Sequence, residues 1–256
     1  MDARPLQDRL ALHTWTLDTT PLGAQLRIAR ETGWNAVELR HIDFTRAFEA
    51  GMSNDEVVGL IRGGGMKVAT LGVKYGWIFA GGEERRRLFD EFAATCANAV
   101  KLGCDLLMSA PGPTVGGTIP EAAASLREAG DVAEAYGLRL AIEFSSVHDV
   151  INRLEKAREM VALAGHSSCG LLLDAYHLER TGAGGRAFED IPPSDIFAFH
   201  YSDCPSTHLP PGRPMDRLPP GQGVVRWHEV FGLLIEKNGS SLFHVGSLNS
   251  SFPPMR

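Results

Sequence analysis

The chain alternates short apolar runs with longer segments in which apolar residues recur every three or four positions. Runs of the first kind are typical of strands buried on both faces, and segments of the second kind of amphipathic helices. The predicted strands are Leu10–Thr14, Ala36–Leu39, Val68–Leu71, Leu106–Ser109, Leu138–Glu143, Gly170–Asp174, Ile196–His200 and a weaker Leu242–Val245. The predicted helical windows are 20–32, 53–63, 84–102, 120–136, 149–164 and 227–237. Such alternation indicates an α/β protein with a parallel sheet.

Several boundaries repeat one local order of helix end, glycine and strand. Gly103 and Gly137 both stand at such a boundary, where a glycine can end a helix. Eight β/α units in one chain predict a (β/α)8 TIM barrel, with residues 1–256 forming a single domain. A doubly wound open sheet is the alternative, but no glycine-rich dinucleotide fingerprint follows the first strand. The pattern therefore favours the barrel.

Composition narrows the classes of partner. Of the 256 residues, 44% are hydrophobic and 22% are charged, which is typical of a globular protein. A net charge of −6 argues against a broad nucleic-acid surface, which needs clustered Lys and Arg. No signal peptide and no run of about 20 apolar residues is present, so we expect a cytoplasmic protein without a membrane partner. The four cysteines lack paired zinc spacing, and we expect reduced, buried thiols.

Polar residues end three of the predicted strands abruptly. Glu143, Asp174 and His200 each close an apolar run, and His177 follows three residues after Asp174. In a parallel barrel the carboxyl ends of the strands meet at one rim, where active sites form. Carboxylates together with imidazoles are ligands for divalent metal ions. The sequence therefore predicts a metal site at this rim.

The motifs around these residues occur in a particular order. Leu-Asp-x-x-His covers 173–177, His-x-x-Asp covers 200–203 and Pro-Gly-x-Gly covers 220–223. With the strand-ending Glu143 before them, they resemble the xylose isomerase-like TIM-barrel superfamily, and within it the sugar isomerases and epimerases, including inosose isomerases and ketose 3-epimerases. The likeness extends over nearly the whole chain in element order, and its motifs lie between 138 and 227.

This resemblance implies a metal-dependent reaction. In the family, one divalent ion is held by a Glu, an Asp, a His and a Glu that end strands five to eight. Glu143, Asp174 and His200 match the first three positions, and the ion would be Mn²⁺, Mg²⁺, Co²⁺ or Zn²⁺. The ion would polarise the carbonyl of a small polyhydroxylated substrate while Glu143 removes the neighbouring proton.

Further residues are expected to contact the substrate. His177 matches the substrate-binding histidine of the family, although a packing role is its alternative. Arg217 stands where the family often supplies a substrate-contacting arginine, although a surface arginine would look the same. Asp203 would contribute to substrate binding or orient His200 or Arg217, with a plain turn residue as the alternative.

Other strand ends supply candidates for the opposite side of the pocket. His13 and Lys74 are predicted to contact the substrate there, with structural or solvent-exposed roles as the alternative. Glu38 and Arg40 also stand at a strand end. They would either line the pocket or pair with each other.

The C-terminal part departs from the family pattern. Gly246 stands where the fourth ligand, a glutamate, is expected, and too little sequence follows for a normal final helix after strand eight. Epimerisation needs groups on both faces of the substrate, so three functions stay open: an isomerase or epimerase, a dehydratase of the same superfamily acting on an inosose or a dehydroshikimate, and a non-catalytic ligand-binding barrel. The substrate, the metal and a possible homo-oligomer are not specified.

Overall fold

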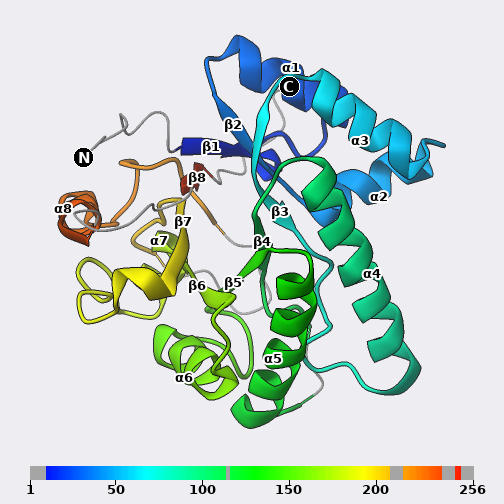
Figure 1. Ribbon diagram of the computed structural model, residues 1–256. Coiled ribbons are helices and arrows are strands. Elements are labelled where there is room, and N and C mark those ends of the chain that lie inside the picture. The colour runs from blue at the N-terminus through cyan, green and yellow to red at the C-terminus, as the bar shows by residue number, and fades with distance from the viewer. Residues whose placement is uncertain (1–9, 114–115, 208–215, 238–245, 249–256) are drawn as a thin grey trace.

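Eight parallel strands close into a barrel in the order β1 to β8, as Figure 1 shows. The computed structural model describes residues 10–113, 116–207, 216–237 and 246–248. Its strands are β1 Leu10–His13, β2 Ala36–Leu39, β3 Lys67–Gly72, β4 Leu106–Ser109, β5 Arg139–Glu143, β6 Cys169–Asp174, β7 Ile196–Tyr201 and β8 Gly246–Leu248. The predicted (β/α)8 barrel is therefore confirmed.

Strand β8 lies between β7 and β1. It pairs with both neighbours through Phe199↔Gly246 and Leu10↔Gly246, which completes the barrel. The predicted strand Leu242–Val245 lies outside the described residues, as do residues 249–256, where the final helix was expected to be missing.

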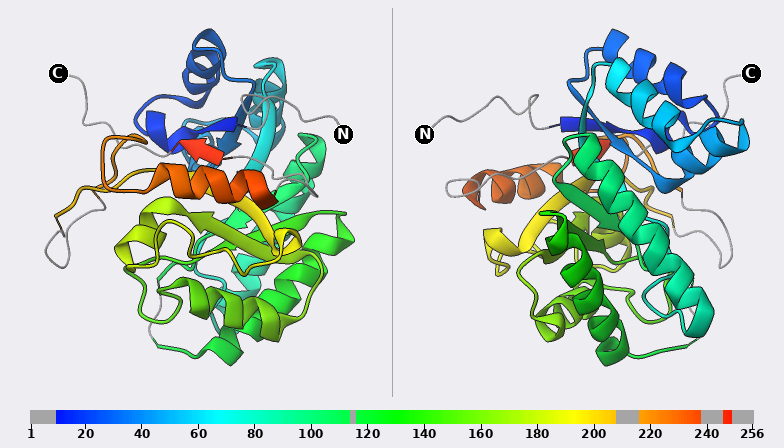
Figure 2. Two further views of the ribbon diagram at one scale, coloured as in Figure 1. Left: turned by 90° about the vertical axis from the view of Figure 1, so that its left-hand side faces the viewer. Right: turned by 45° about the vertical axis from the view of Figure 1, so that its right-hand side comes forward.

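The helices surround the barrel (Figures 1 and 2). They are α1 Leu22–Glu31, α2 His41–Glu49, α3 Asn54–Gly63, α4 Gly82–Lys101, α5 Ile119–Ala135, α6 Leu154–Ala164, α7 Ala175–Arg180 and α8 Trp227–Lys237, with short 3₁₀ turns η2 Thr14–Leu17 and η3 Pro193–Asp195. Helices α2 and α7 were not predicted. Both begin directly after a strand and are too short to show a clear period of 3.6 residues.

Local sequence signals explain where the predicted helices begin and end. Ser53 and Thr118 each cap a helix by accepting a hydrogen bond from the backbone N–H of a glutamate three residues on, while that glutamate side chain bonds back. Gly103 and Gly137 adopt φ angles of 66° and 71°, a left-handed conformation that ends a helix and that glycine adopts without steric cost.

The barrel interior supports the polar rim from below. Met108, Ala141, Leu172 and Ala198 belong to one buried apolar cluster on four adjacent strands. Side chains alternate along a strand, so the residue two positions after each of the last three points to the same face. That position is occupied by Glu143, Asp174 and His200, respectively. The strands thereby direct these three polar groups onto the apolar interior of the barrel.

The structure also bears on the expectations about the cysteine thiols and about membrane-spanning helices. All four cysteines are buried free thiols, as predicted. Burial raises the pKa of Cys96, Cys104 and Cys169 to about 12, so these thiols stay protonated. Over the described ranges, no helix has the length and apolar character needed to cross a membrane.

Candidate active site

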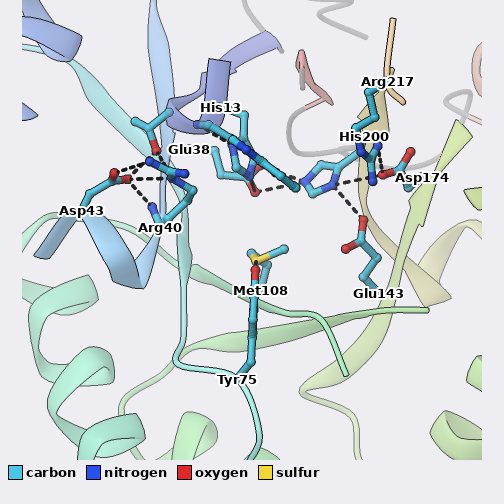
Figure 3. Close-up of polar contacts among 12 residues, drawn as sticks. His13, Glu38, Arg40, Asp43, Tyr75, Met108, Glu143, Asp174, His200 and Arg217 are labelled. Atoms are coloured by element: carbon cyan, nitrogen blue, oxygen red, sulfur yellow. Dashed lines mark hydrogen bonds and ion pairs between the residues drawn. The ribbon is translucent and has the colours of Figure 1, made fainter. Parts of the chain in front are cut away.

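The three predicted metal ligands lie together at the carboxyl ends of β5, β6 and β7. The side chain of Glu143 is 8% exposed, that of Asp174 is fully buried and that of His200 is 2% exposed. The Nδ1 atom of His200 lies 3.0 Å from Oε1 of Glu143 and 3.9 Å from Oδ2 of Asp174, as Figure 3 shows. A buried place lined by two carboxylates and one imidazole nitrogen fits a divalent cation.

The charges of Glu143 and His200 depend on each other. Burial raises the pKa of Glu143, and the neighbouring His200 only partly opposes that shift. Burial alone would lower the pKa of His200, but Glu38 and Glu143 raise it well above its ordinary value. The pair therefore retains a proton in the place where a cation would be attracted.

Asp174 is held by a guanidinium. Arg217 is buried, and its Nη1 donates to Oδ2 of Asp174 over 2.7 Å and to the hydroxyl of Ser202. Burial alone would raise the pKa of Asp174, but Arg217 above all, with His177 and His200, lowers it to about 2. Asp174 is therefore a carboxylate, and Arg217 lies inside the cluster, not on the surface.

The Asp-x-x-His spacing has a structural cause. Asp174 caps helix α7, because its Oδ1 accepts a hydrogen bond of 2.8 Å from the backbone N–H of Tyr176. His177 follows in the first turn of that helix, and its Nε2 lies 3.1 Å from Nη2 of Arg217. One short helix thus places His177 and Asp174 beside the same guanidinium.

The tautomer of His177 suits it to donate a hydrogen bond to a ligand. Its Nδ1 accepts from the backbone N–H of Ser146 over 3.1 Å, so the proton of the neutral ring is on Nε2. Burial lowers the pKa of His177 to about 3, although Asp174 opposes the shift. The Nε2–H therefore faces a guanidinium N–H of Arg217, and a ligand oxygen between them could accept from both. A metal ion could not bind this Nε2, because its lone pair is not available.

Glu38 joins the site in a way that the sequence prediction left open. It ends β2 and is buried, and its carboxylate lies 3.0 and 3.3 Å from Nε2 of His200. Arg40 does not pair with it, because its guanidinium bonds Asp43 over 2.7 Å and also reaches Asp18. The suggested Glu38–Arg40 pair is therefore wrong. A carboxylate at the end of an apolar strand was the available signal, as it was for Glu143.

His13 and Lys74 lie in different surroundings. His13 is buried at the end of β1, with Nε2 at 3.4 Å from Oε1 of Glu38. Lys74 is directed to helix α4, where its ammonium lies 2.8 Å from Glu91. The next residue, Tyr75, places its hydroxyl 4.0 Å from Sδ of Met108, beneath the polar cluster in Figure 3. The structure thus brings His13 and Tyr75 to the cluster, whereas Lys74 pairs with the helix layer.

Tyr75 adds a neutral hydroxyl to the barrel mouth. Tyr75 is 44% exposed, but its hydroxyl is buried, which raises its pKa, and the nearby carboxylates of Glu143 and Glu38 raise it further. The phenol therefore stays protonated. No motif indicated Tyr75, because an aromatic residue after a strand is more often a packing residue.

Asp203 organises the loop that carries Arg217. Its carboxylate accepts four hydrogen bonds of 2.8–2.9 Å, from the backbone N–H groups of Cys204, Gly221 and Val225 and from the Trp227 indole. Its backbone also pairs with Leu218 in both directions, over 2.8 and 2.9 Å. These four donors use the carboxylate that was predicted to serve the substrate, His200 or Arg217. Through its backbone, Asp203 also fixes Leu218, the residue next to Arg217, and its predicted role towards the substrate stays a prediction.

A cavity of about 360 Å³ opens beside these groups. The loops after β3, β4 and β5 form it, and its lining residues are Tyr75, Ala110, Pro111, Gly112, Pro113, Ser145, Val147, His148 and Asp149. Tyr75 is the residue that this lining shares with the surroundings of Glu143.

The segment that should provide the fourth ligand contains no carboxylate. Strand β8 consists of Gly246, Ser247 and Leu248. Its register places Ser247 beside His200 and Gly246 beside Phe199. At neither position does β8 supply the glutamate of the family pattern.

Comparisons with known proteins identify the family of this fold. A family model described as a xylose isomerase-like TIM barrel matches residues 26–250. An inosose isomerase of Bacillus velezensis is 24% identical over 218 residues, or 82% of this chain and 77% of that protein. A crystal structure of the IolI protein with a bound zinc atom has a TM-score of 0.79 at 24% identity, covering 94% of this chain and 88% of that one. An L-ribulose 3-epimerase structure has a TM-score of 0.71 at 17% identity, covering 96% and 82%. Because the family model matches most of its length, the chain belongs to the xylose isomerase-like TIM barrel family.

Proposed function

We propose that the protein is a divalent-metal-dependent isomerase or epimerase of a small polyhydroxylated ketone, either a ketose or an inosose. The observation that carries this proposal is the buried convergence of Glu143, Asp174 and Nδ1 of His200 at the rim where barrel enzymes place their active sites. The inosose isomerase relative and the zinc atom in the IolI structure support it.

Three side chains would hold the ion. Glu143 and Asp174 offer oxygen ligands and His200 offers Nδ1, a mixed set that suits Mn²⁺, Co²⁺, Zn²⁺ or Mg²⁺. When bound, such an ion supplies Lewis-acid polarisation of the substrate carbonyl.

The protein's own residues carry the proton and orient the substrate. Glu143 would act as the base, because burial raises the pKa of its carboxyl towards the range where a general base works well at neutral pH. The Nε2–H of His177 and the guanidinium of Arg217 would bind one substrate oxygen between them. Tyr75 would donate from the cavity side as a neutral phenol. His13, Lys74 and Asp203 were predicted to bind the substrate, and of these the ring of His13 packs against the ring of His200.

A dehydratase is the second candidate, favoured by the composition of β8. Abstraction of a proton beside a carbonyl also begins an elimination, which needs one base and not a pair on opposite faces. Strand β8 offers no carboxylate as the opposing group. An unsaturated ketone as the product would identify a dehydratase, whereas a rearranged ketose or inosose would identify an isomerase.

The proposal is tested by metal loading and a substrate panel. The chelator-treated protein is reloaded with Mn²⁺, Co²⁺, Zn²⁺ or Mg²⁺, and turnover of inososes and ketoses is followed. We expect at least one ion to bind and activate. We also expect Glu143→Gln to lower kcat by about 10²–10⁴-fold, because a positioned base contributes about that much. Glu91→Gln is the matched control and should leave kcat nearly unchanged, since Glu91 lies on α4, where it pairs with Lys74.

Each contradicting outcome has a separate meaning. If no divalent ion binds or activates, the metal site is wrong. If Glu143→Gln turns over as fast as the wild type, Glu143 is not the base. If the loaded protein binds ketoses without converting them, the chain is a non-catalytic binding barrel.

A further inference from the structure

The orientation of His200 is determined by a series of polar contacts that begins at a backbone amide. The N–H of Trp15 donates to Nδ1 of His13 over 2.9 Å. A backbone amide can only donate, so this Nδ1 carries the lone pair and the neutral ring carries its proton on Nε2. The tautomer of His13 is thereby fixed by the turn that follows β1.

The next link is the carboxylate of Glu38. The Nε2 of His13 lies 3.4 Å from Oε1 of Glu38, and Nε2 of His200 lies 3.0 Å from the same oxygen. An ionised carboxylate only accepts hydrogen bonds, so Nε2–H of His200 donates to it, while Nε2–H of His13 lies beside the same oxygen. Figure 3 shows Glu38 on the opposite side of the His200 ring from Glu143.

Packing limits any rotation of the ring. The rings of His13 and His200 meet edge to face, with centroids 5.5 Å apart and an angle of 85° between their planes. Both side chains are almost completely buried. The ring of His200 is therefore held both by the bond to Glu38 and by contact with His13.

This arrangement leaves one nitrogen of His200 for a ligand. With Nε2–H bonded to Glu38, a neutral His200 directs its Nδ1 lone pair at Glu143 and Asp174. An imidazole that binds a metal commonly donates its other N–H to a carboxylate, which fixes its tautomer. The same reasoning argues against an ion among His13, Glu38 and His200, because the lone pair of His13 is already used by Trp15.

We propose that Glu38 and His13 are positioning residues that orient His200 so that Nδ1 binds the metal ion. Glu38 would act on the ion only through His200. This inference rests on the proposed function in one respect, that His200 is a metal ligand.

The test measures zinc affinity and the tautomer of His200. Zinc affinity is determined by competition with a chelator for the wild type, Glu38→Ala, Glu38→Gln and Asp43→Asn. Asp43 is the matched control, since it is also a buried carboxylate after β2 but bonds Arg40 instead of His200. Two-bond ¹H–¹⁵N spectra of the zinc-loaded wild type then identify which nitrogen of His200 carries the proton.

We expect Glu38→Ala to weaken zinc binding about 10–100-fold, as loss of such outer carboxylates usually does. Glu38→Gln should weaken zinc binding less than Glu38→Ala does, but by more than about threefold. Its amide oxygen still accepts from Nε2–H of His200, although without a charge. The zinc affinity of Asp43→Asn should stay within about threefold of the wild-type affinity. The spectra should show His200 protonated on Nε2. If Glu38→Ala does not fold, Glu38→Gln and the wild-type spectra decide the question.

Two results would overturn the inference. One is wild-type zinc binding that both folded Glu38 variants retain within threefold, and the other is zinc bound through Nε2 of His200. Failure of the wild type to bind zinc, Mn²⁺, Co²⁺ or Mg²⁺ would instead remove the proposed function, and the two failures are thus distinguishable.

Discussion

Arg217 is the residue whose surroundings say most about the site. Its guanidinium contacts Asp174, Ser202 and His177. The guanidinium also lies over the ring of Tyr176, with its central carbon Cζ 4.4 Å from the ring centroid. A guanidinium is planar, always charged and carries several N–H donors, so it can bond several acceptors in a fixed geometry, which the single ammonium of lysine cannot. Arg217 therefore both keeps Asp174 ionised and directs an N–H at the place proposed for the substrate oxygen.

Arg217→Lys should separate substrate binding from metal binding. An ammonium cannot make the same contacts, and loss of a buried hydrogen bond costs about 1–3 kcal/mol, which corresponds to roughly 5–150-fold in kcat/KM. Zinc affinity should not fall, because Asp174 is released from its guanidinium partner. Steady-state kinetics and chelator competition check both expectations, with exposed Arg226→Lys as the control. A parallel fall in zinc affinity with unchanged ketose binding would contradict this assignment.

At the scale of elements, the ends of strands are the most informative positions. The rule that a polar residue closing an apolar strand belongs to the site predicted Glu143, Asp174 and His200, which the structure brings together. The rule is weaker beyond the strand end. One residue of shift reverses the face, so Lys74 pairs with α4 while Tyr75 faces the barrel mouth. That choice depends on the register of β3 and on the neighbouring loops, which one sequence does not specify.

The loop after β7 is stabilised by the charge of Asp203. Burial alone would raise the pKa of its carboxyl, but bonds from the Trp227 indole and from backbone N–H groups lower it. A lowered pKa means that the charged form stabilises the fold. This contribution is complete above the unfolded pKa of about 3.9 and is lost as the pH falls through the lower folded value.

Asp203→Asn should therefore destabilise the protein most clearly at neutral pH. We expect the free energy of unfolding to fall by about 1–3 kcal/mol at pH 7, because an amide cannot accept from four donors as a carboxylate does. The difference from the wild type should shrink below about pH 4. Urea unfolding monitored by tryptophan fluorescence at both pH values measures this, and Asp190→Asn, at an exposed ion pair, is the control. An equal loss at both pH values would show that the charge of Asp203 is not responsible.

At the scale of the whole molecule, the repeated β/α pattern was enough to predict the barrel. Two kinds of feature could not be predicted from periodicity. Helices α2 and α7 are short and are set by contacts at their first residues, including the Asp174 side chain that caps α7. Strand β8 is set by pairing with β7 and β1, which closes the barrel at Gly246–Leu248. Local pattern therefore determined the architecture, whereas contacts between distant segments determined these details.

The central claim is that the rim of this barrel binds one catalytic metal ion. A crystal structure of the zinc-loaded protein, with anomalous diffraction at the zinc edge, tests it most directly. The account predicts one zinc peak bonded to Glu143, Asp174 and Nδ1 of His200, with ligand distances of about 2.0–2.2 Å. A zinc peak bonded to Nε2 of His200 between His13 and Glu38, or no peak among these side chains at saturating zinc, would contradict it.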